Sequence, residues 1–311
     1  MKHLRIGTRG SMLAKWQAEF VRKQLFQQAG VETEIVIIKT SGDKLQQVSL
    51  SEIGGQGIFI KELELALLDK TIDIAVHSVK DVPTEVRQGM AFPAICQRAD
   101  VRDCIVSANN ATLATLRQGA RIGTGSLRRQ AQLRHVRPDL DVRDLRGNVD
   151  TRLRKVESGE YDAIVLAKAG LDRLGATHRI SEILSPDVCL PAVGQGAIGV
   201  ECRADDTESN EVLDKLNHPE TRAAIVAERT LLAALQGGCQ VPLGAWARID
   251  REELILEACV CSADGQQYVR QRLTGSPDNP REVGEKMAAA LIEAGAKTIL
   301  EEVTRQRSTS P

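Results

Sequence analysis

In the first third of the chain, short runs of apolar residues alternate with segments in which apolar residues recur at helical spacing. The short apolar runs predict strands at residues 4–8, 34–39 and 72–76. The helical spacing predicts one helix from Ser11 to about residue 28 and another at residues 58–68. The second strand is a continuous apolar run, which is typical of a strand covered on both faces in a parallel sheet. The order β-α-β-α-β predicts a doubly wound α/β domain.

A second α/β pattern begins near residues 100–103. The predicted strands are 121–124, 142–145 and 161–166, and the predicted helices are 127–136, 149–157 and 168–174. Each of these strands runs into a turn and then a helix, so this region again predicts a parallel sheet with helical crossovers.

The rest of the chain departs from this alternation. Residues 197–201 predict a strand that returns to the first sheet, so the chain would cross twice between the first two domains, as in clamshell binding proteins. Beyond a linker at 217–219, the pattern predicts an α+β domain. Its predicted elements are helices at 221–235 and 280–293 and strands near 243–249, 253–260 and 267–273, followed by a disordered tail at 308–311.

The fold class expected from these patterns is α/β, with two doubly wound domains and a C-terminal α+β domain. The expected boundaries are 1–98 plus 197–215 for domain 1, 99–196 for domain 2 and 216–311 for domain 3. Domain 3 contains a glycine-rich loop with a cysteine, Cys239.

Composition excludes several classes of function. The 311 residues are 42% hydrophobic and 27% charged, which is typical of a globular protein of two or three domains. A net charge of −1 and an aromatic content of 3% argue against nucleic-acid binding, since neither a global positive charge nor stacking platforms are available. No apolar run is long enough to span a membrane, and residues 1–6 lack the apolar segment of a signal peptide, so we expect a cytoplasmic protein without a membrane partner.

The seven cysteines indicate a reduced protein. An odd number without a signal peptide argues against a disulfide framework, and the lack of a CxxC pair argues against structural zinc, so we expect no metal. Cys239 differs from the others because it lies between two glycines and Pro242, on a loop that ends a predicted helix. A thiol on such a loop is a candidate nucleophile or attachment point. A buried loop cysteine is the alternative, and on this stretch alone it is the simpler interpretation.

Polar residues follow the third predicted strand of domain 1. Ser78, Lys80 and Asp81 come directly after the apolar run at 72–76. Ligands of open α/β sheets collect at the carboxyl ends of strands, so these side chains are placed to meet a polar substrate. The alternative is a solvated turn with a local lysine–aspartate pair, which would contribute little to stability.

Positive charge is concentrated in domain 2. Residues 121–155 contain ten Lys or Arg and four Asp, a local charge of +6 in a chain whose net charge is −1. The free N–H groups at a helix start favour an anion, and planar guanidiniums suit carboxylate or phosphate. The arginines that follow three successive predicted strands are therefore expected to bind an anion: Arg128, Arg129, Arg146, Arg152 and Arg173. A solvated surface is the expected setting of Arg134, Arg137, Arg143 and Arg154.

Six longer motifs occur in order along the chain: KELE at 61–64, AVHSVKDVP at 75–83, SLRRQ at 126–130, LRGNV at 145–149, LPAVGQG at 190–196 and GGCQVP at 237–242. Together they closely resemble the motifs of the porphobilinogen deaminase (hydroxymethylbilane synthase) family. The resemblance extends from residue 5 to the C-terminal helix. It implies two clamshell domains like those of type II periplasmic binding proteins, followed by a C-terminal domain that carries the cofactor cysteine.

The resemblance also implies an activity. Members of this family carry a dipyrromethane cofactor joined by a thioether to the loop cysteine, here Cys239. Four porphobilinogen molecules lose ammonia in turn, each giving an electrophilic azafulvene that the free α-carbon of the terminal pyrrole attacks. Water then releases hydroxymethylbilane, a linear tetrapyrrole of porphyrin and heme biosynthesis. The family expectation is a monomer with porphobilinogen as its small-molecule substrate.

Matching the family's motifs residue by residue implies roles for individual side chains. Asp81 would be the catalytic carboxylate and Cys239 the attachment point of the cofactor. The acetate and propionate of each pyrrole would be neutralised by arginines, since like charges would otherwise repel in the cleft. The residues implied to bind the cofactor are Ser78, Lys80, Asp81, Thr124, Ser126, Arg128, Arg129, Arg146 and Gln195. Those implied to bind substrate or the growing chain are Arg9, Ser11, Phe59, Arg146, Arg152 and Arg173.

Three positions depart from the family's common pattern. Gln56 and Glu52 stand where lysine is frequent, and Gly125 stands where serine is frequent. We therefore give Gln56 no charged role in the glycine-rich loop at 54–57.

Two other classes of protein fit part of the pattern. A solute-binding receptor would also use two crossed α/β domains with anion-binding strand ends, but such receptors are usually exported and need neither the Cys239 loop nor a third domain. A phosphate or nucleic-acid binder would use the arginine-rich segment, although the low aromatic content and the near-neutral net charge argue against it. Intact mass separates the three classes, since only the deaminase carries a covalent adduct on Cys239.

Overall fold

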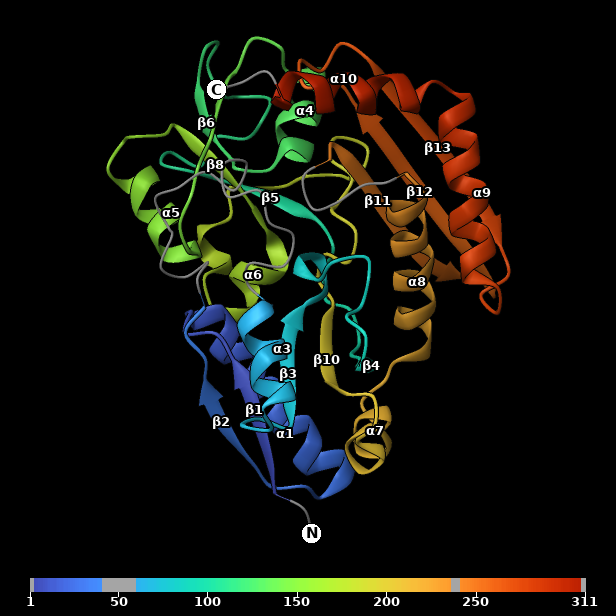
Figure 1. Cartoon of the computed structure of the whole chain (residues 1–311). Helices are drawn as coiled ribbons and strands as arrows, with labels where there is room; N and C mark the ends of the chain where they lie inside the picture. The colour runs from blue at the N-terminus through green and yellow to red at the C-terminus, as the bar shows by residue number, and fades with distance from the viewer. Residues whose placement is uncertain (1–2, 41–59, 236–240, 309–311) are drawn as a thin grey trace. The chain divides into compact units, whose positions relative to one another are not determined.

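The computed structural model describes residues 3–40, 60–235 and 241–308. Gln56, Phe59 and Cys239 lie outside the described residues, as does Glu52. The chain divides into two compact units: Met1–Ala99 with Gly196–Arg222, and Asp100–Gln195 with Ala223–Pro311. Three sheets lie within these units (Figure 1).

The first unit is built on a five-stranded sheet of order β2-β1-β3-β10-β4 (Figure 1). β1 pairs in parallel with β2 and β3, and β10 pairs antiparallel with β3 and β4. The return of the chain to this sheet, predicted at 197–201, is confirmed. The strands are β1 (Leu4–Thr8), β2 (Thr33–Ile37), β3 (Ile74–Ser78), β4 (Met90–Ile95) and β10 (Ile198–Arg203).

Helices cover both faces of this sheet, as a doubly wound domain requires. On one face α1 (Met12–Ala29) and α7 (Thr207–Asp214) pack over a core that includes the fully buried Leu25. On the other face α3 (Lys61–Leu68) packs over a second core that includes Leu63. The predicted β-α-β-α-β order is therefore confirmed for the described residues, and α7 is an addition that the sequence did not predict.

The second strand packs against the cores on both faces of the sheet, as predicted, but it is not fully buried. β2 lies at the edge of the sheet, and its residues are half-buried or exposed, with Ile37 50% exposed. Ile35 packs against the core beneath α1 and Val36 against the core beneath α3. The apolar run reflects these two contacts, but an edge strand has a neighbour on one side only and stays partly open.

The second unit contains a sheet of the same topology, in the order β7-β6-β8-β5-β9. β6 pairs in parallel with β7 and β8, and β5 pairs antiparallel with β8 and β9, which confirms the parallel pairing predicted here. The strands are β5 (Asp103–Ser107), β6 (Arg121–Gly123), β7 (Asp141–Arg143), β8 (Ala163–Ala167) and β9 (Glu182–Ile183). The helices are α4 (Leu127–Val136), α5 (Val149–Glu157) and α6 (Lys168–Arg173), and α4 and α5 have the predicted bounds.

In both five-stranded sheets the fourth strand runs against the first three. In the first unit this strand is β10, which the chain forms after it returns at residue 196. In the second unit it is β5, which the chain forms directly after it enters at residue 100. The two predicted crossovers between the domains are therefore confirmed.

The second unit also contains a three-stranded antiparallel sheet, β11 (Leu243–Asp250), β12 (Glu253–Cys261) and β13 (Tyr268–Gly275). Helices α8 (Pro219–Ala234) and α9 (Pro280–Glu293) share its apolar core, as does the start of α10 (Ala296–Ser308). The predicted α+β pattern is confirmed, and α10 was not predicted. Residue 308, placed in a disordered tail by the sequence, ends this helix.

No helix in the described part of the chain is long and apolar enough to cross a membrane. The six described cysteines are all buried free thiols, and no group of His, Cys, Asp or Glu in these ranges could hold a metal ion.

Candidate active site

Two of the predicted site segments leave the sheet of the first unit at the same edge. β1 and β3 are parallel neighbours, so the turn after Thr8 and the turn after Ser78 both lie at their carboxyl ends. Ser11 caps α1, and its hydroxyl accepts a hydrogen bond of 3.2 Å from the backbone N–H of Ala14. The Ser78 hydroxyl accepts a 2.8 Å hydrogen bond from Nε2 of Gln17, also on α1. The structure thus brings the segments of Arg9, Ser11, Ser78, Lys80 and Asp81 to one edge.

Asp81 ends a short 3₁₀ turn, η1 (Val79–Asp81), which directly follows β3. The turn is closed by a 3.1 Å bond from the Val82 N–H to the Val79 carbonyl, and the Val79 N–H donates to the carbonyl of Ala197 at 3.1 Å. The Asp81 side chain is half-buried, and its carboxylate makes no hydrogen bond or ion pair within the described ranges. A fixed backbone therefore presents a carboxylate that is available to a ligand.

A buried polar pair beside this turn was not predicted from the sequence. His77 Nε2 lies 2.9 Å from Oε2 of Glu201, and both side chains are almost fully buried. The pair joins β3, one residue before Ser78, to the returning strand β10. It holds in register the strand that leads into Asp81.

The strand ends at which the sequence predicts an anion site in the second unit lie at one edge of its sheet. Because β6, β7 and β8 are parallel, the segments that follow Gly123, Arg143 and Ala167 leave the sheet at one edge. Thr124 is fully buried, and its hydroxyl accepts from the Ser126 N–H at 3.3 Å. The Ser126 hydroxyl in turn accepts from the Arg129 N–H at 3.5 Å and caps α4.

The main surprise is the setting of Arg128 and Arg129. Both side chains are buried, and both form ion pairs with one fully buried carboxylate, that of Asp103. The distances are 2.8 Å from Arg128 Nη1 to Oδ2 and 2.7 Å from Arg129 Nη2 to Oδ1. Burial alone would raise the pKa of Asp103, but the two guanidiniums hold it far below its usual value. Asp103 is therefore ionised, and the cluster of three keeps a net positive charge.

Two donors of this cluster remain for a ligand. The Nε atoms of Arg128 and Arg129 are buried and have no hydrogen-bond partner in the described part of the chain. A buried donor without a partner is costly, and a carboxylate is the acceptor that guanidiniums bind best. These residues therefore fit a ligand that carries carboxylates, such as the acetate and propionate side chains of a dipyrromethane.

Gln195 lies next to the same cluster. Its Nε2 atom donates to the Val101 carbonyl at 2.7 Å and to Oδ1 of Asp103 at 2.8 Å. Both N–H bonds of the amide are thus directed into the protein. The other polar atom of this amide, Oε1, is an acceptor, which suits an N–H group better than a carboxylate.

The other arginines of the predicted site lie on the same edge of the sheet. Nε of Arg146 is 3.2 Å from a carboxylate oxygen of Asp144, and Nε of Arg152 donates to the carbonyl of Gly147 at 2.7 Å. Gly147 has φ +107°, so the turn that orients these arginines requires a glycine. Arg173 is the last residue of α6, six residues beyond the end of β8.

The predicted solvated setting holds for two arginines and fails for two. Arg143 and Arg154 are exposed, as expected. Arg137 is half-buried and donates to the carbonyls of Leu113 and Leu116. Arg134 is half-buried because it bridges α4 to the turn between β12 and β13, a contact with a distant segment that has no local signal.

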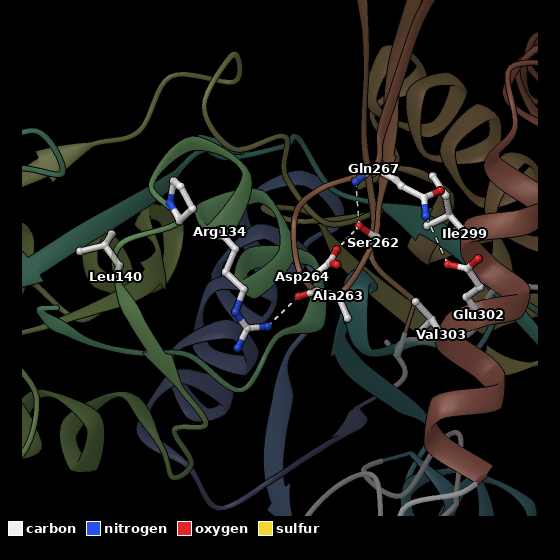
Figure 2. A pocket seen from close by; sticks show the side chains of 10 residues that line it. Arg134, Leu140, Ser262, Ala263, Asp264, Gln267, Ile299, Glu302 and Val303 are labelled. Carbon is white, nitrogen blue, oxygen red and sulfur yellow. Dashed lines mark hydrogen bonds between the residues drawn. The ribbon is translucent and has the colours of Figure 1, made fainter. Parts of the chain in front are cut away.

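Figure 2 shows the cavity beside Arg134, which has a volume of about 410 Å³. Nη1 of Arg134 donates to the Ala263 carbonyl at 2.7 Å, and Nε2 of Gln267 lies 3.4 Å from a carboxylate oxygen of Glu302 on α10. Leu140 and Ile299 add apolar walls. None of the described residues of the predicted active site lines this cavity.

Gly125 explains one departure from the family pattern. A Cβ atom at this position would lie 2.8 Å from the carbonyl oxygen of Leu145, at the end of the neighbouring strand segment. Contacts that short essentially never occur, so a serine here would force the two turns apart. The close approach of these turns depends on glycine.

Comparison with solved structures gives distant similarities to periplasmic binding proteins. The VFT2 domain of BvgS from Bordetella pertussis is 16% identical, has a TM-score of 0.41, and the match covers 69% of this chain and 86% of that one. A periplasmic arginine-binding protein from Salmonella typhimurium is 14% identical, has a TM-score of 0.38, and the match covers 69% and 91%.

Comparison with protein families and curated sequences gives close matches. Residues 4–211 match the family model described as porphobilinogen deaminase, dipyromethane cofactor binding domain. Residues 223–293 match the model described as porphobilinogen deaminase, C-terminal domain. A curated porphobilinogen deaminase from Trichlorobacter lovleyi is 49% identical over 303 residues, which are 97% of each chain. The two family models match successive parts of the chain, and the relative covers nearly all of it. The chain therefore belongs to the porphobilinogen deaminase family.

Proposed function

We propose that this chain carries out the reaction of its family with the residues described above. It is a transferase that deaminates four porphobilinogen molecules, joins them head to tail on a dipyrromethane primer, and releases hydroxymethylbilane by hydrolysis. The observation that carries the proposal is the buried cluster of Asp103, Arg128 and Arg129, which retains positive charge and unused donors at a strand-end edge.

The arginines neutralise a charge that grows with each step. Every pyrrole adds an acetate and a propionate, and two like charges about 4 Å apart repel by roughly 4 kcal/mol at an effective dielectric of 20. Guanidiniums offset this repulsion and fix the register of the chain by paired hydrogen bonds. We assign cofactor carboxylates to Arg128, Arg129 and Arg146, and substrate or product carboxylates to Arg9, Arg152 and Arg173.

Asp81 acts on the reacting pyrrole. Its carboxylate, free of protein partners in the described residues, stabilises the positive charge that develops as ammonia leaves and moves a proton at the departing amine. Ser78 and Lys80, in the same turn as Asp81, orient the reacting pyrrole. The cofactor, when bound, supplies the free α-carbon that takes the first substrate.

The remaining assignments follow the family match. Cys239 holds the cofactor through a thioether, Thr124 and Ser126 donate to its side chains, and Gln195 accepts from a pyrrole N–H. Ser11 and Phe59 contact substrate. We also propose the three-domain division at residues 98, 196 and 215, a monomer, and a cytoplasmic location. The six free thiols of the described residues support the location, because free thiols are typical of a reducing compartment.

Two measurements test this proposal. We expect the intact mass of the native protein to exceed the polypeptide mass by one dipyrromethane, and Cys239→Ser to lose that adduct. Asp81→Ala should keep the adduct and lose about 100- to 10,000-fold in turnover, the range of a general acid–base group. A bare polypeptide mass in active protein would rule the proposal out, and near-normal turnover of Asp81→Ala would remove Asp81 from the chemistry.

A further inference from the structure

Asp103 is the first residue of β5, directly after the chain enters the second unit. Its carboxylate is completely buried and is surrounded by four donors. Oδ1 accepts from Arg129 Nη2 at 2.7 Å and from Gln195 Nε2 at 2.8 Å. Oδ2 pairs with Arg128 Nη1 at 2.8 Å and accepts from the Cys189 thiol at 3.4 Å. Both oxygens of this carboxylate therefore have two partners within the second unit.

No other carboxylate contacts Arg128 or Arg129 in the described residues. Their remaining protein acceptors are neutral: Arg128 donates to the Leu190 carbonyl at 2.5 Å, and Arg129 donates to the Val165 carbonyl at 3.1 Å. Cys189 is neutral as well, since burial raises the pKa of its thiol to about 12. Asp103 is therefore the one charged partner among the described residues that joins the two guanidiniums.

The Asp103 carboxylate also lies close to the two segments by which the chain passes between the units, near Ala99 and Gly196. Gln195, the last residue of the second unit before the chain leaves it, donates to Asp103 and to the carbonyl of Val101. In the first unit, the N–H of Ala99 donates to the carbonyl of Gly196 at 3.2 Å. The outgoing and returning segments thus run side by side, and Asp103 connects them to the arginines.

We propose that Asp103 is a positioning residue for the deaminase reaction, which holds Arg128, Arg129 and Gln195 in the geometry that receives the cofactor. The inference rests on the proposed function, because it assumes that these three residues meet the cofactor. Asp103 itself touches neither cofactor nor substrate. It acts by fixing the orientation of groups that do.

The test compares Asp103→Asn and Asp103→Glu with the native holoenzyme. Asparagine keeps the shape and removes the charge, and glutamate keeps the charge and displaces it by one methylene. We expect both variants to carry less adduct by intact mass, and the adduct-bearing fraction to lose about 100-fold in kcat, since a misplacement of about 1 Å can cost that much. If the asparagine variant is insoluble, the glutamate variant decides alone.

Glu257→Gln is the matched control. Glu257 is also a buried carboxylate shared by two arginines of the second unit, with Arg248 and Arg270 at 2.9 and 2.8 Å, and no role in the site is assigned to it. We expect Glu257→Gln to lose about as much thermal stability as the Asp103 variants but to keep its full adduct and native kcat. This result would separate a positioning role of Asp103 from general destabilisation. Native adduct content and kcat within twofold of wild type in Asp103→Glu would overturn the inference.

Arg129→Gln distinguishes failure of this inference from failure of the proposed function. If Arg129→Gln loses adduct or turnover while both Asp103 variants behave as wild type, the arginine assignment stands and the positioning role is wrong. If Arg129→Gln also keeps native adduct content and turnover, the proposed role of the arginine cluster is wrong, and the positioning role falls with it.

Discussion

Arginines of similar sequence context have different settings in this protein, and distant residues decide which. Arg143 and Arg154 extend into solvent, whereas Arg128 and Arg129 are buried on an aspartate 25 or more residues away along the chain. The local sequence correctly placed Arg128 and Arg129 after a strand and a glycine. It could not identify Asp103, because nothing near that residue marks it as the partner of two buried cations.

At this scale, Glu257 predicts a pH dependence of stability. Burial alone would raise its pKa, but hydrogen bonds from Arg270 and Arg248 outweigh burial and hold the pKa below its usual value. A carboxylate whose pKa is lower in the folded state than in the unfolded state stabilises the protein at pH values above its unfolded-state pKa. This stabilisation is lost as the pH falls through the folded-state pKa. We expect the Tm difference between wild type and Glu257→Gln to be constant above about pH 5.5, where the carboxylate is ionised in both states, and to shrink in more acidic solution.

Thermal unfolding of both proteins at a series of pH values checks this expectation. A Tm difference that stays the same from neutral pH to below pH 4 would show that the ionisation of Glu257 is not linked to folding.

At the scale of elements, the predictions succeeded where periodicity was long and capped. The helices α4, α5 and α9 have the predicted bounds, and each lies between clear start and stop residues. The elements that were missed are β4, β5, β9, α7 and α10. β5 illustrates the reason: its apolar run is only three residues long, and pairing with β8 and β9 makes Asp103–Ser107 a core strand.

A close helix contact gives a prediction at this scale. Gly284 on α9 faces α8, and a Cβ atom there would lie 2.5 Å from the Ala227 carbonyl oxygen and 2.8 Å from Cβ of Thr230. Alanine favours a helix by about 1 kcal/mol over glycine, but overpacking costs about 1–3 kcal/mol. We expect Gly284→Ala to destabilise the protein by about 1–2 kcal/mol.

Urea unfolding measures this change, with Glu285→Ala as the control because Glu285 is the exposed neighbour in the same helix. The control should stay within about 0.5 kcal/mol of wild type. A stabilised Gly284→Ala would mean that α8 and α9 separate easily and that the contact has little influence on packing.

At the scale of the whole molecule, charge is balanced in total but not in distribution. The net charge of −1 conceals a segment of +6 between residues 121 and 155. The covalent cofactor brings carboxylates to this segment, so a protein without it keeps buried cations and unused donors at the strand-end edge. The cofactor is therefore expected to contribute to stability as well as to catalysis.

We predict that Cys239→Ser, which lacks the cofactor, gains more stability from a carboxylate ligand than the holoenzyme does. A ligand that binds only the folded state adds about 2.7 kcal/mol at 100 times its Kd. Thermal unfolding with increasing citrate, against sodium chloride of equal ionic strength, measures the gain. Equal gains in both proteins would indicate that the cofactor leaves the anion site open.

The family and its reaction could be predicted from the sequence because four of the six motifs flank strands of the described sheets, where binding residues are close to one another along the chain. The sheet order could be predicted only in part. The parallel strands follow from the β-α-β rhythm, but the insertion of β10 between β3 and β4 joins residues more than 100 positions apart. Local patterns carry no information about such pairing.

The insertion of β10 also has a consequence for synthesis. The ribosome delivers β4 about 100 residues before β10, and at about 5–20 residues per second this leaves a delay of many seconds. Until β10 emerges, β3 has an open edge and β4 has no neighbour to pair with. The central α/β segment from Asp103 to Ile183 is continuous and meets no such delay. We therefore expect the first unit to complete its folding after the central α/β segment, although its synthesis begins first. We also expect a chaperone that acts on nascent chains to bind the first unit during this delay.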